Sequence, residues 1–153
     1  MTPTPLRESQ AAVALARTRT PGGWAYLCQW SDTWRALHFV GGHREPGESF
    51  RECAAREVQE ELHLTADQFA LPAEPLARLE YVAFSESARV PTWYLMAVFP
   101  LVLSDDARRR AEGEPENAWV GPADVRRGTT ADGRRVSPTV SLLLGKLGLL
   151  PTE

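Results

Sequence analysis

Residues 41–64 read GGHREPGESFRECAAREVQEELHL, and most of what the sequence predicts starts from this stretch. It opens with two glycines and reaches the pair Pro46-Gly47 a few residues later. Glycine pairs and Pro-Gly are turn signals, and glycine also lets the backbone come close to a ligand. The sequence therefore predicts a loop over residues 41–47.

A helix is predicted directly after this loop. Ser49 is followed three residues later by Glu52, the pattern of a capping box, in which each side chain satisfies a backbone N–H group at the start of the helix. The helix should begin at Phe50 and run to about residue 62. Apolar residues recur every four positions and form the stripe that faces the core: Phe50, Ala54, Val58 and Leu62.

The same helix carries Glu57, Glu60 and Glu61 on one side. With 3.6 residues per turn these glutamates fall within an arc of roughly 100°, so we expect their carboxylates to converge. Like charges at this spacing each cost a helix about 0.2–0.5 kcal/mol, and Arg56 alone cannot neutralise all three. Carboxylate oxygens suit Mg²⁺, which completes its shell with water and substrate phosphate. The face indicates either a cation site for phosphate chemistry or a solvated acidic surface.

The spacing of the whole stretch resembles the Nudix box. Five residues separate Gly42 from Glu48, seven more precede Arg56, and the run REVQEELHL follows over residues 56–64. Eight of the nine specified positions agree, and the exception is His63, where the family has glycine. That glycine ends the catalytic helix, where left-handed backbone is common, and histidine tolerates a positive φ better than most other residues. We expect only a modest cost.

Resemblance to the Nudix, or MutT-like, hydrolases implies a fold and an activity. The fold is α+β, an α/β/α sandwich with a mixed sheet and a catalytic loop and helix at about residues 41–63. The activity is hydrolysis of the pyrophosphate bond in a nucleoside diphosphate linked to another group, with Mg²⁺ as cofactor or Mn²⁺ in its place. A nucleoside triphosphate or related nucleotide is favoured as substrate, and a dinucleoside polyphosphate is second.

The resemblance also assigns roles to residues of the box. It implies metal binding by Glu57, Glu60, Glu61, Gly41, Gly42 and Glu48, the glycines through a backbone carbonyl. Glu57 is also a candidate general base, and Arg56 would orient it. Glu48 is either a metal ligand through water or a structural partner of the box.

Further residues are candidates for contact with the substrate, although each also suits an ordinary surface or core position. Arg35, His43 and Arg44 flank the predicted site and carry groups that bind phosphate. Tyr81 lies 17 residues past Leu64 (81 minus 64), a spacing that resembles diadenosine polyphosphate hydrolases. Some family members supply a base or metal ligand from a later loop, and the glutamates in a comparable place are Glu112, Glu114 and Glu116.

The rest of the chain reads as strands with one closing helix. Apolar runs at residues 11–19 and 24–30 are separated by Pro21-Gly22-Gly23, which predicts a β-hairpin. A bulge or break is expected at Pro100. The remaining predictions are strands at residues 34–40, 76–84, 92–103 and 118–120, a loop at 65–75, and a helix at 138–147.

Composition sets the broad class. With 153 residues the chain suits one domain over residues 1–153. A net charge of -3 disfavours binding to duplex nucleic acid or an anionic membrane. Two cysteines predict buried thiols rather than a disulfide framework. The start of the chain lacks a signal-peptide pattern, so a cytoplasmic location is expected, and homodimer formation stays open.

Two other functions are compatible with this sequence. One is a catalytically inactive Nudix-fold module that binds a nucleotide or metabolite and regulates another process. Such modules often lack one of the box glutamates, whereas all three are present here. The other is an unrelated interaction protein with an acidic helix, which would make the spacing of the Gly42–Glu48 stretch a coincidence. A metal-dependent hydrolase accounts for the pattern best.

Overall fold

The structure is a computed structural model that describes residues 6–150. Its strands are β1 (Arg7–Leu15), β2 (Arg17–Thr20), β3 (Gly23–Ser31), β4 (Ala36–His43), β5 (Phe69–Ala70), β6 (Ala77–Ser85), β7 (Val90–Pro100), β8 (Val102–Leu103) and β9 (Asn117–Val120). Its helices are α1 (Phe50–Leu62), the 3₁₀ helix η1 (Ala66–Gln68), α2 (Asp105–Gly113), α3 (Pro122–Arg127) and α4 (Pro138–Lys146). The α+β class predicted from the sequence is confirmed.

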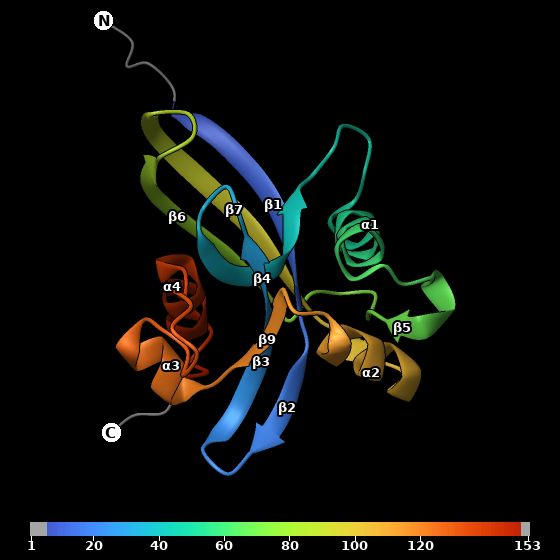
Figure 1. The fold of residues 1–153 in the computed structure, drawn as a ribbon. Coiled ribbons are helices and arrows are strands. Elements are labelled where there is room, and N and C mark those ends of the chain that lie inside the picture. The colour runs from blue at the N-terminus through green and yellow to red at the C-terminus, as the bar shows by residue number, and fades with distance from the viewer. Residues whose placement is uncertain (1–5, 151–153) are drawn as a thin grey trace, which may run out of the picture.

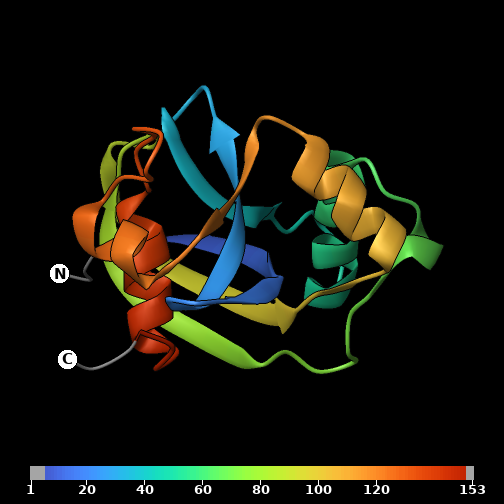
Figure 2. The same cartoon turned by 60° about the horizontal axis from the view of Figure 1, so that its bottom comes forward.

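Seven strands form one mixed sheet. Its order is β2-β3-β4-β1-β7-β6, with β9 paired to β3. The neighbours β1 and β7 run parallel, and the other pairs of this sheet are antiparallel. Helices α1 and α2 cover one face of the sheet, and α3 and α4 cover the other (Figures 1 and 2). The predicted α/β/α sandwich is therefore confirmed.

Strand β1 shows how the two faces are built from one sequence. Alternate side chains of a strand point to opposite faces. Ala12 and Ala14 pack into the core beneath α1 and α2. Val13 and Leu15 pack into the core beneath α3 and α4. Because both faces are covered there, residues 11–15 of the strand form an unbroken apolar run rather than an alternating one.

Helix α1 matches its prediction. It spans Phe50–Leu62, and Ser49 and Glu52 form the capping box. Three residues of the predicted apolar stripe, Ala54, Val58 and Leu62, are buried, whereas the fourth, Phe50, is only partly buried at the start of the helix. His63 ends the helix with φ 56° and ψ 44°, so the residue at the position of the box glycine does adopt the left-handed conformation.

The predicted hairpin is wrong in its first arm. Residues 11–19 divide between two strands at Ala16, and only β2 pairs with β3. Strand β1 instead pairs with β4 and β7, which are far away in the sequence. The local turn signal identified the turn at Pro21-Gly22-Gly23 correctly, but the partner of β1 is set by long-range packing.

The sequence suggested that Gly41 and Gly42 end a strand, but they do not. Strand β4 continues through Gly41 and Gly42 to His43, and both glycines pair with β1. A Cβ on Gly41 would collide with the backbone carbonyl of Ala12. The glycines therefore allow close strand pairing, and the loop before α1 is shorter than predicted, at residues 44–49.

The other strand predictions and the closing helix are confirmed within one to three residues at their ends. The strand predicted over residues 92–103 is interrupted after Pro100, where β7 ends, and β8 begins at Val102. Helices α2 and α3 were not predicted. In α2 only Ala107 and Ala111 are buried, so its sequence has no strong apolar stripe.

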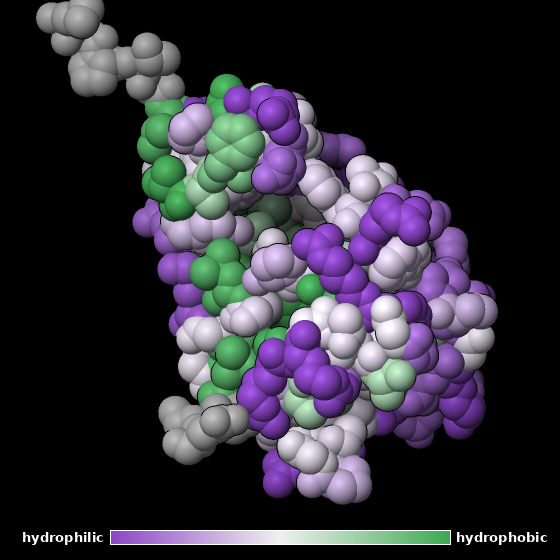
Figure 3. All heavy atoms as spheres, turned by 60° about the vertical axis from the view of Figure 1, so that its left-hand side comes forward, coloured by the Kyte–Doolittle hydropathy of each residue, from purple (hydrophilic) through white to green (hydrophobic). Residues whose placement is uncertain are grey.

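Strand β6 forms one end of the sheet path within residues 6–150. Val82 and Phe84 on this strand are more than half exposed, and Figure 3 views the molecule from this side, where apolar surface lies next to polar surface. No helix in the described part of the chain is long and apolar enough to cross a membrane. The single domain over residues 1–153 stays a prediction, and its ends, residues 1–5 and 151–153, lie outside the described residues.

Candidate active site

The site is built where α1 crosses the end of β4. A Cβ added to Gly42 would lie 2.6 Å from the carboxylate carbon of Glu57, a separation that real Cβ atoms do not show. The carboxylate of Glu57 thus occupies the space that a side chain at position 42 would take, and a larger residue there would displace the end of the Glu57 side chain. The Sγ of Cys53, one turn earlier in the helix, donates to the carbonyl oxygen of Gly42 at 3.4 Å. Gly42 therefore lies in direct contact with the helix through Cys53 and Glu57.

Arg56 organises the acidic residues around it. Its Nε donates to one carboxylate oxygen of Glu48 at 2.7 Å, and its Nη2 donates to the other at 3.1 Å. Its Nη1 donates to Glu57 at 2.9 Å and approaches Glu60 at 3.4 Å. Its Nη2 also donates to the carbonyl oxygen of His43 at 3.1 Å. One guanidinium thus ties the loop before the helix to two helical glutamates.

This pairing sets the charge state of Glu48. The hydrogen bonds from Arg56 and from the backbone N–H of Glu45 lower the pKa of Glu48 from 4.5 to about 2. The pKa of Arg56 is raised in turn, chiefly by its hydrogen bonds to Glu48. Both oxygens of Glu48 are engaged by the guanidinium in a fork-like pair. These contacts favour the structural role for Glu48 over the role of metal ligand.

Glu61 has the opposite environment. Burial raises the pKa of Glu61 to about 8, and a hydrogen bond with Glu57 and the charge of Glu57 add to the rise. The backbone N–H of Gly41 bonds to this carboxylate and partly offsets the rise. Glu57 and Glu61 thus lie against each other and against the backbone of Gly41. Two carboxylates this close favour either a shared proton or a bound cation.

The three box glutamates do not converge on one point. Glu57 and Glu61 are partly buried and face each other, whereas the exposed Glu60 turns toward Arg56. Among residues 6–150 no group of three or more His, Cys, Asp or Glu side chains is arranged to hold a metal ion. The expected convergence is therefore incomplete in this structure. The carboxylate oxygens of Glu57 and Glu61 still fit a hard divalent cation.

Gln29 supports the site and was missed by sequence reasoning. Its Nε2 donates to the backbone carbonyl of Glu61 and to Oδ1 of Asn117, both at 2.9 Å. Asn117 in turn donates to the carbonyl of Ala111 at 2.9 Å. This chain of bonds ties the end of α1 to β3, β9 and α2. A polar residue inside the apolar run WAYLCQW was the available signal.

The structure brings two of the proposed substrate-contacting residues to the site. Nδ1 of His43 lies 3.2 Å from Oγ of Ser9, and the His43 carbonyl bonds to Arg56. Arg44 donates through Nε to Gln10 at 2.7 Å and through Nη1 to the carbonyl of Glu48 at 2.8 Å. His43 ends β4 and Arg44 begins the loop at 44–49, so both lie next to the site, and their contact with substrate stays a prediction.

The other candidates lie elsewhere. Arg35 is exposed in the turn between β3 and β4, with φ 51°. Tyr81 stacks on Tyr94 at 5.1 Å and packs into the core beneath α3 and α4, across the sheet from α1. Glu112 lies inside α2, not in a loop, and accepts a hydrogen bond from Trp119. Glu114 caps that helix, and Glu116 follows in the connection to β9.

Comparison with solved structures shows the same fold. The C. elegans Ap4A hydrolase aligns with a TM-score of 0.58 and 19% identity, over 92% of this chain and 96% of that one. A NUDIX hydrolase from Nitrosomonas europaea aligns with a TM-score of 0.59 and 20% identity, over 93% and 89%. Shewanella oneidensis NrtR, in complex with a 27mer DNA, aligns with a TM-score of 0.60 and 14% identity, over 90% of this chain and 59% of NrtR. At these identities the likeness concerns the fold alone.

The family is shown by a match in sequence. The model of the NUDIX domain matches residues 6–140, which is most of the chain. Nudix hydrolases generally cleave pyrophosphate bonds in nucleotides and use divalent metals such as Mg²⁺. On the strength of this match, together with the box geometry around Gly42 and Arg56, the chain belongs to the Nudix family.

Proposed function

We propose that this chain is an active Mg²⁺-dependent pyrophosphohydrolase acting on a nucleoside diphosphate linked to another group. One observation carries the proposal. Glu57 and Glu61 are held against each other beside the backbone of Gly41, and burial opposes the ionisation of Glu61. Arrangements that destabilise an ionised carboxylate cost the protein stability, and they are concentrated at functional sites. A divalent cation would remove this cost.

The residues that would hold the cation are Glu57 and Glu61 with the backbone carbonyl of Gly41 or Gly42, and Glu60 after a change of rotamer. When bound, Mg²⁺ or Mn²⁺ supplies neutralisation of the pyrophosphate charge and a bound water of lowered pKa. Arg56 holds Glu57 in place by its 2.9 Å bond. Glu57 is thereby positioned to accept a proton from water, as the general base we propose.

Glu48 acts on this site through Arg56. Because both of its oxygens bond to the guanidinium, it fixes the direction in which Arg56 presents Nη1 to Glu57. A low pKa keeps Glu48 ionised across the neutral range, so this support persists at working pH. The catalytic set that we propose is Glu57, Arg56, Glu60 and Glu61.

The proposed substrate is a nucleoside triphosphate or related nucleotide, with a dinucleoside polyphosphate as the second class. The fold shared with the C. elegans Ap4A hydrolase makes the second class worth testing. We propose a nucleotide rather than duplex nucleic acid as the partner, because the net charge of -3 provides no broad attraction to a phosphate backbone.

The test is a substrate screen with matched variants. The wild-type chain, Glu57→Gln and Glu60→Gln are incubated with Mg²⁺ and a panel of nucleoside triphosphates, nucleotide sugars, ADP-ribose and dinucleoside polyphosphates. Glu86→Gln serves as the control, because Glu86 is exposed on the turn after β6. Release of phosphate or nucleoside monophosphate should require Mg²⁺, stop in chelator, and fall about 100-fold or more in the two site variants. Binding without turnover across the panel would instead identify a regulatory module.

A further inference from the structure

The two ends of the sheet path differ in how they are protected from pairing with a further strand. An edge strand has a row of backbone N–H and C=O groups without strand partners, and natural proteins often shield such a strand by making it short or highly charged. Strand β2, at one end, has four residues, and two of them are Arg17 and Arg19. Strand β6, at the other end, has nine residues, ARLEYVAFS, with no proline or lysine and one charge of each sign. Within residues 6–150 its one strand partner is β7, so its outer edge is open.

Alternate side chains along this edge form an exposed row of two charges between two apolar groups. Arg78, Glu80 and Val82 are exposed, and they lie on one face of the sheet because side chains two residues apart in a strand share a face. Leu76, directly before the strand, continues the row, and Leu76 and Val82 are both more than half exposed. The row reads apolar, positive, negative, apolar. When it is laid against its own reverse, each charge meets the opposite charge and each apolar group meets the other apolar group.

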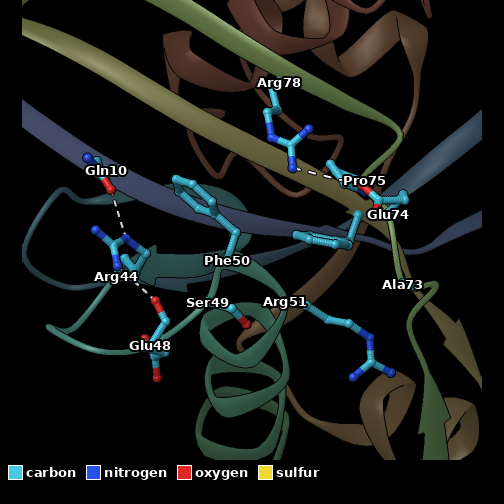
Figure 4. Close-up of a pocket in the computed structure, with 11 residues that line it drawn as sticks. Gln10, Arg44, Glu48, Ser49, Phe50, Arg51, Ala73, Glu74, Pro75 and Arg78 are labelled. Carbon is cyan, nitrogen blue, oxygen red and sulfur yellow. Dashed lines mark hydrogen bonds and ion pairs between the residues drawn. The ribbon is translucent and has the colours of Figure 1, made fainter.

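Neither charge of the row has a strong partner in the described part of the chain. Arg78 approaches Glu74 at 3.9 Å, and both side chains are exposed to solvent. Figure 4 shows Arg78 projecting from β6 beside a cavity of about 590 Å³, which Arg44 and Phe50 also line. Glu80 forms no hydrogen bond or ion pair with any residue between positions 6 and 150. Both charged groups are therefore available to a partner outside this chain.

Antiparallel pairing of two β6 strands about a two-fold axis fixes which residues meet. Residues equally distant from the axis lie opposite each other, and directly opposite side chains interact. With the axis at Leu79, Arg78 of each copy lies opposite Glu80 of the other. Leu76 of each copy then lies opposite Val82 of the other. An axis at Arg78 or at Glu80 would instead place like charges face to face, which is unfavourable.

We propose that β6 is an interface between two copies of this chain, which pair antiparallel about a two-fold axis at Leu79. The row favours a second copy over an unrelated strand, because one strand supplies both halves of every opposite pair. Backbone hydrogen bonds between the two edges supply affinity, and the side-chain row fixes the register. The inference concerns a surface outside the proposed catalytic set and does not depend on hydrolysis.

The experiment exchanges the two charges of the row. Analytical ultracentrifugation over a concentration series gives the dissociation constant of the dimer for wild type, Arg78→Glu, Glu80→Arg and the double variant Arg78→Glu/Glu80→Arg. Each single variant places like charges opposite each other at two symmetric positions, so the dissociation constant should rise at least about tenfold, equal to about 1.4 kcal/mol. The double variant restores opposite charges and should return the dissociation constant to within about threefold of wild type. Arg109→Glu, at an exposed arginine of α2, is the control and should leave the dimer unchanged.

Mixing the two single variants tests the pairing a second time. In a heterodimer of Arg78→Glu with Glu80→Arg, opposite charges meet at both positions, so the mixture should dimerise more tightly than either variant alone. Circular dichroism and Tm confirm that each variant is folded, as expected for substitutions at exposed positions. A wild-type chain that stays monomeric, a dimer that is unaffected by either reversal, or no gain from the double variant and the mixture would overturn the proposal.

Discussion

Glu48 and Glu61 are both acidic residues of the same 23-residue box, yet their environments push their pKa values in opposite directions. Glu48 lies in the loop before α1 and shares a bidentate bond with Arg56, which lowers its pKa to about 2. Glu61 lies in the last turn of α1, where burial and the nearby Glu57 raise its pKa to about 8. The bonds from Arg56 account for the low pKa of Glu48, and burial accounts for the high pKa of Glu61.

The two ends of the Nudix box therefore have different roles. At one end of the motif, Arg56 neutralises the charge of Glu48 and holds the loop on the helix, so this pair has a structural role. At the other end two carboxylates, Glu57 and Glu61, lie against each other beside the strand backbone, and of these two only Glu57 contacts Arg56. An external cation is the natural complement of the second end and not of the first.

Removing Arg56 should have the largest effect on this contrast. We expect Arg56→Met to lower the free energy of unfolding by about 2–3 kcal/mol, because partly buried carboxylates lose their charge-assisted partner. Hydrolysis should fall at least about 100-fold, since Glu57 loses its orientation. Urea unfolding and kcat/KM measure the two effects. The double variant Arg56→Met/Glu48→Gln should be less destabilised than the sum of the single variants, and strict additivity would show that the pair is not coupled.

Neutralising Glu61 should abolish cation binding and raise stability in the absence of metal. In chelator at pH 7, Glu61→Gln should be more stable than wild type, because burial opposes the ionised carboxylate that the unfolded chain carries and the amide has no charge to bury. In wild type, Mg²⁺ at tenfold excess over its Kd should raise the free energy of unfolding by about 1.4 kcal/mol and so raise the Tm. This rise in Tm should be lost in Glu61→Gln. Glu86→Gln should keep the full rise. An undiminished Mg²⁺ response in Glu61→Gln would remove Glu61 from the cation site.

Acid should act on the Glu48 end of the contrast. Because the folded-state pKa of Glu48 is about 2 and its ordinary value is 4.5, its contribution to stability is present above about pH 4.5 and is lost as pH falls toward 2. Thermal unfolding is measured in chelator between pH 5 and pH 3, on the order of the window between the two pKa values. Over this range the Tm of wild type should fall more steeply than the Tm of Glu48→Gln. Parallel curves for the two proteins would contradict the pairing.

The smallest effect is expected at the end of the helix. His63 has φ 56°, a conformation that costs an L-residue free energy. We expect His63→Gly to raise the free energy of unfolding by about 0.5–1 kcal/mol, and His63→Ala to lower it. Hydrolysis should change less than twofold in His63→Gly, since this exposed side chain points away from the core. A stabilising alanine would show that the left-handed backbone is not strained.

Some parts of this molecule were predictable because their causes are local. The capping box of Ser49 and Glu52 and the apolar stripe of α1 act within a few residues, so the helix bounds agree with the structure. The left-handed backbone at His63 also follows from the end of one helix. Helix α2 escaped prediction because only two small alanines face the core, and β1 lost its predicted partner to strands far along the chain.

The sequence by itself determined the family, the bounds of α1 and the identity of its acidic residues, because spacing along one helix decides which side chains share a face. Tertiary structure alone decided that Arg56 binds both carboxylate oxygens of Glu48 and that Glu61 is buried against Glu57. It also decided that Arg44 and Arg78 line one cavity. These outcomes depend on distances between segments that only the packed sheet brings together, and on burial, which no spacing along the chain records.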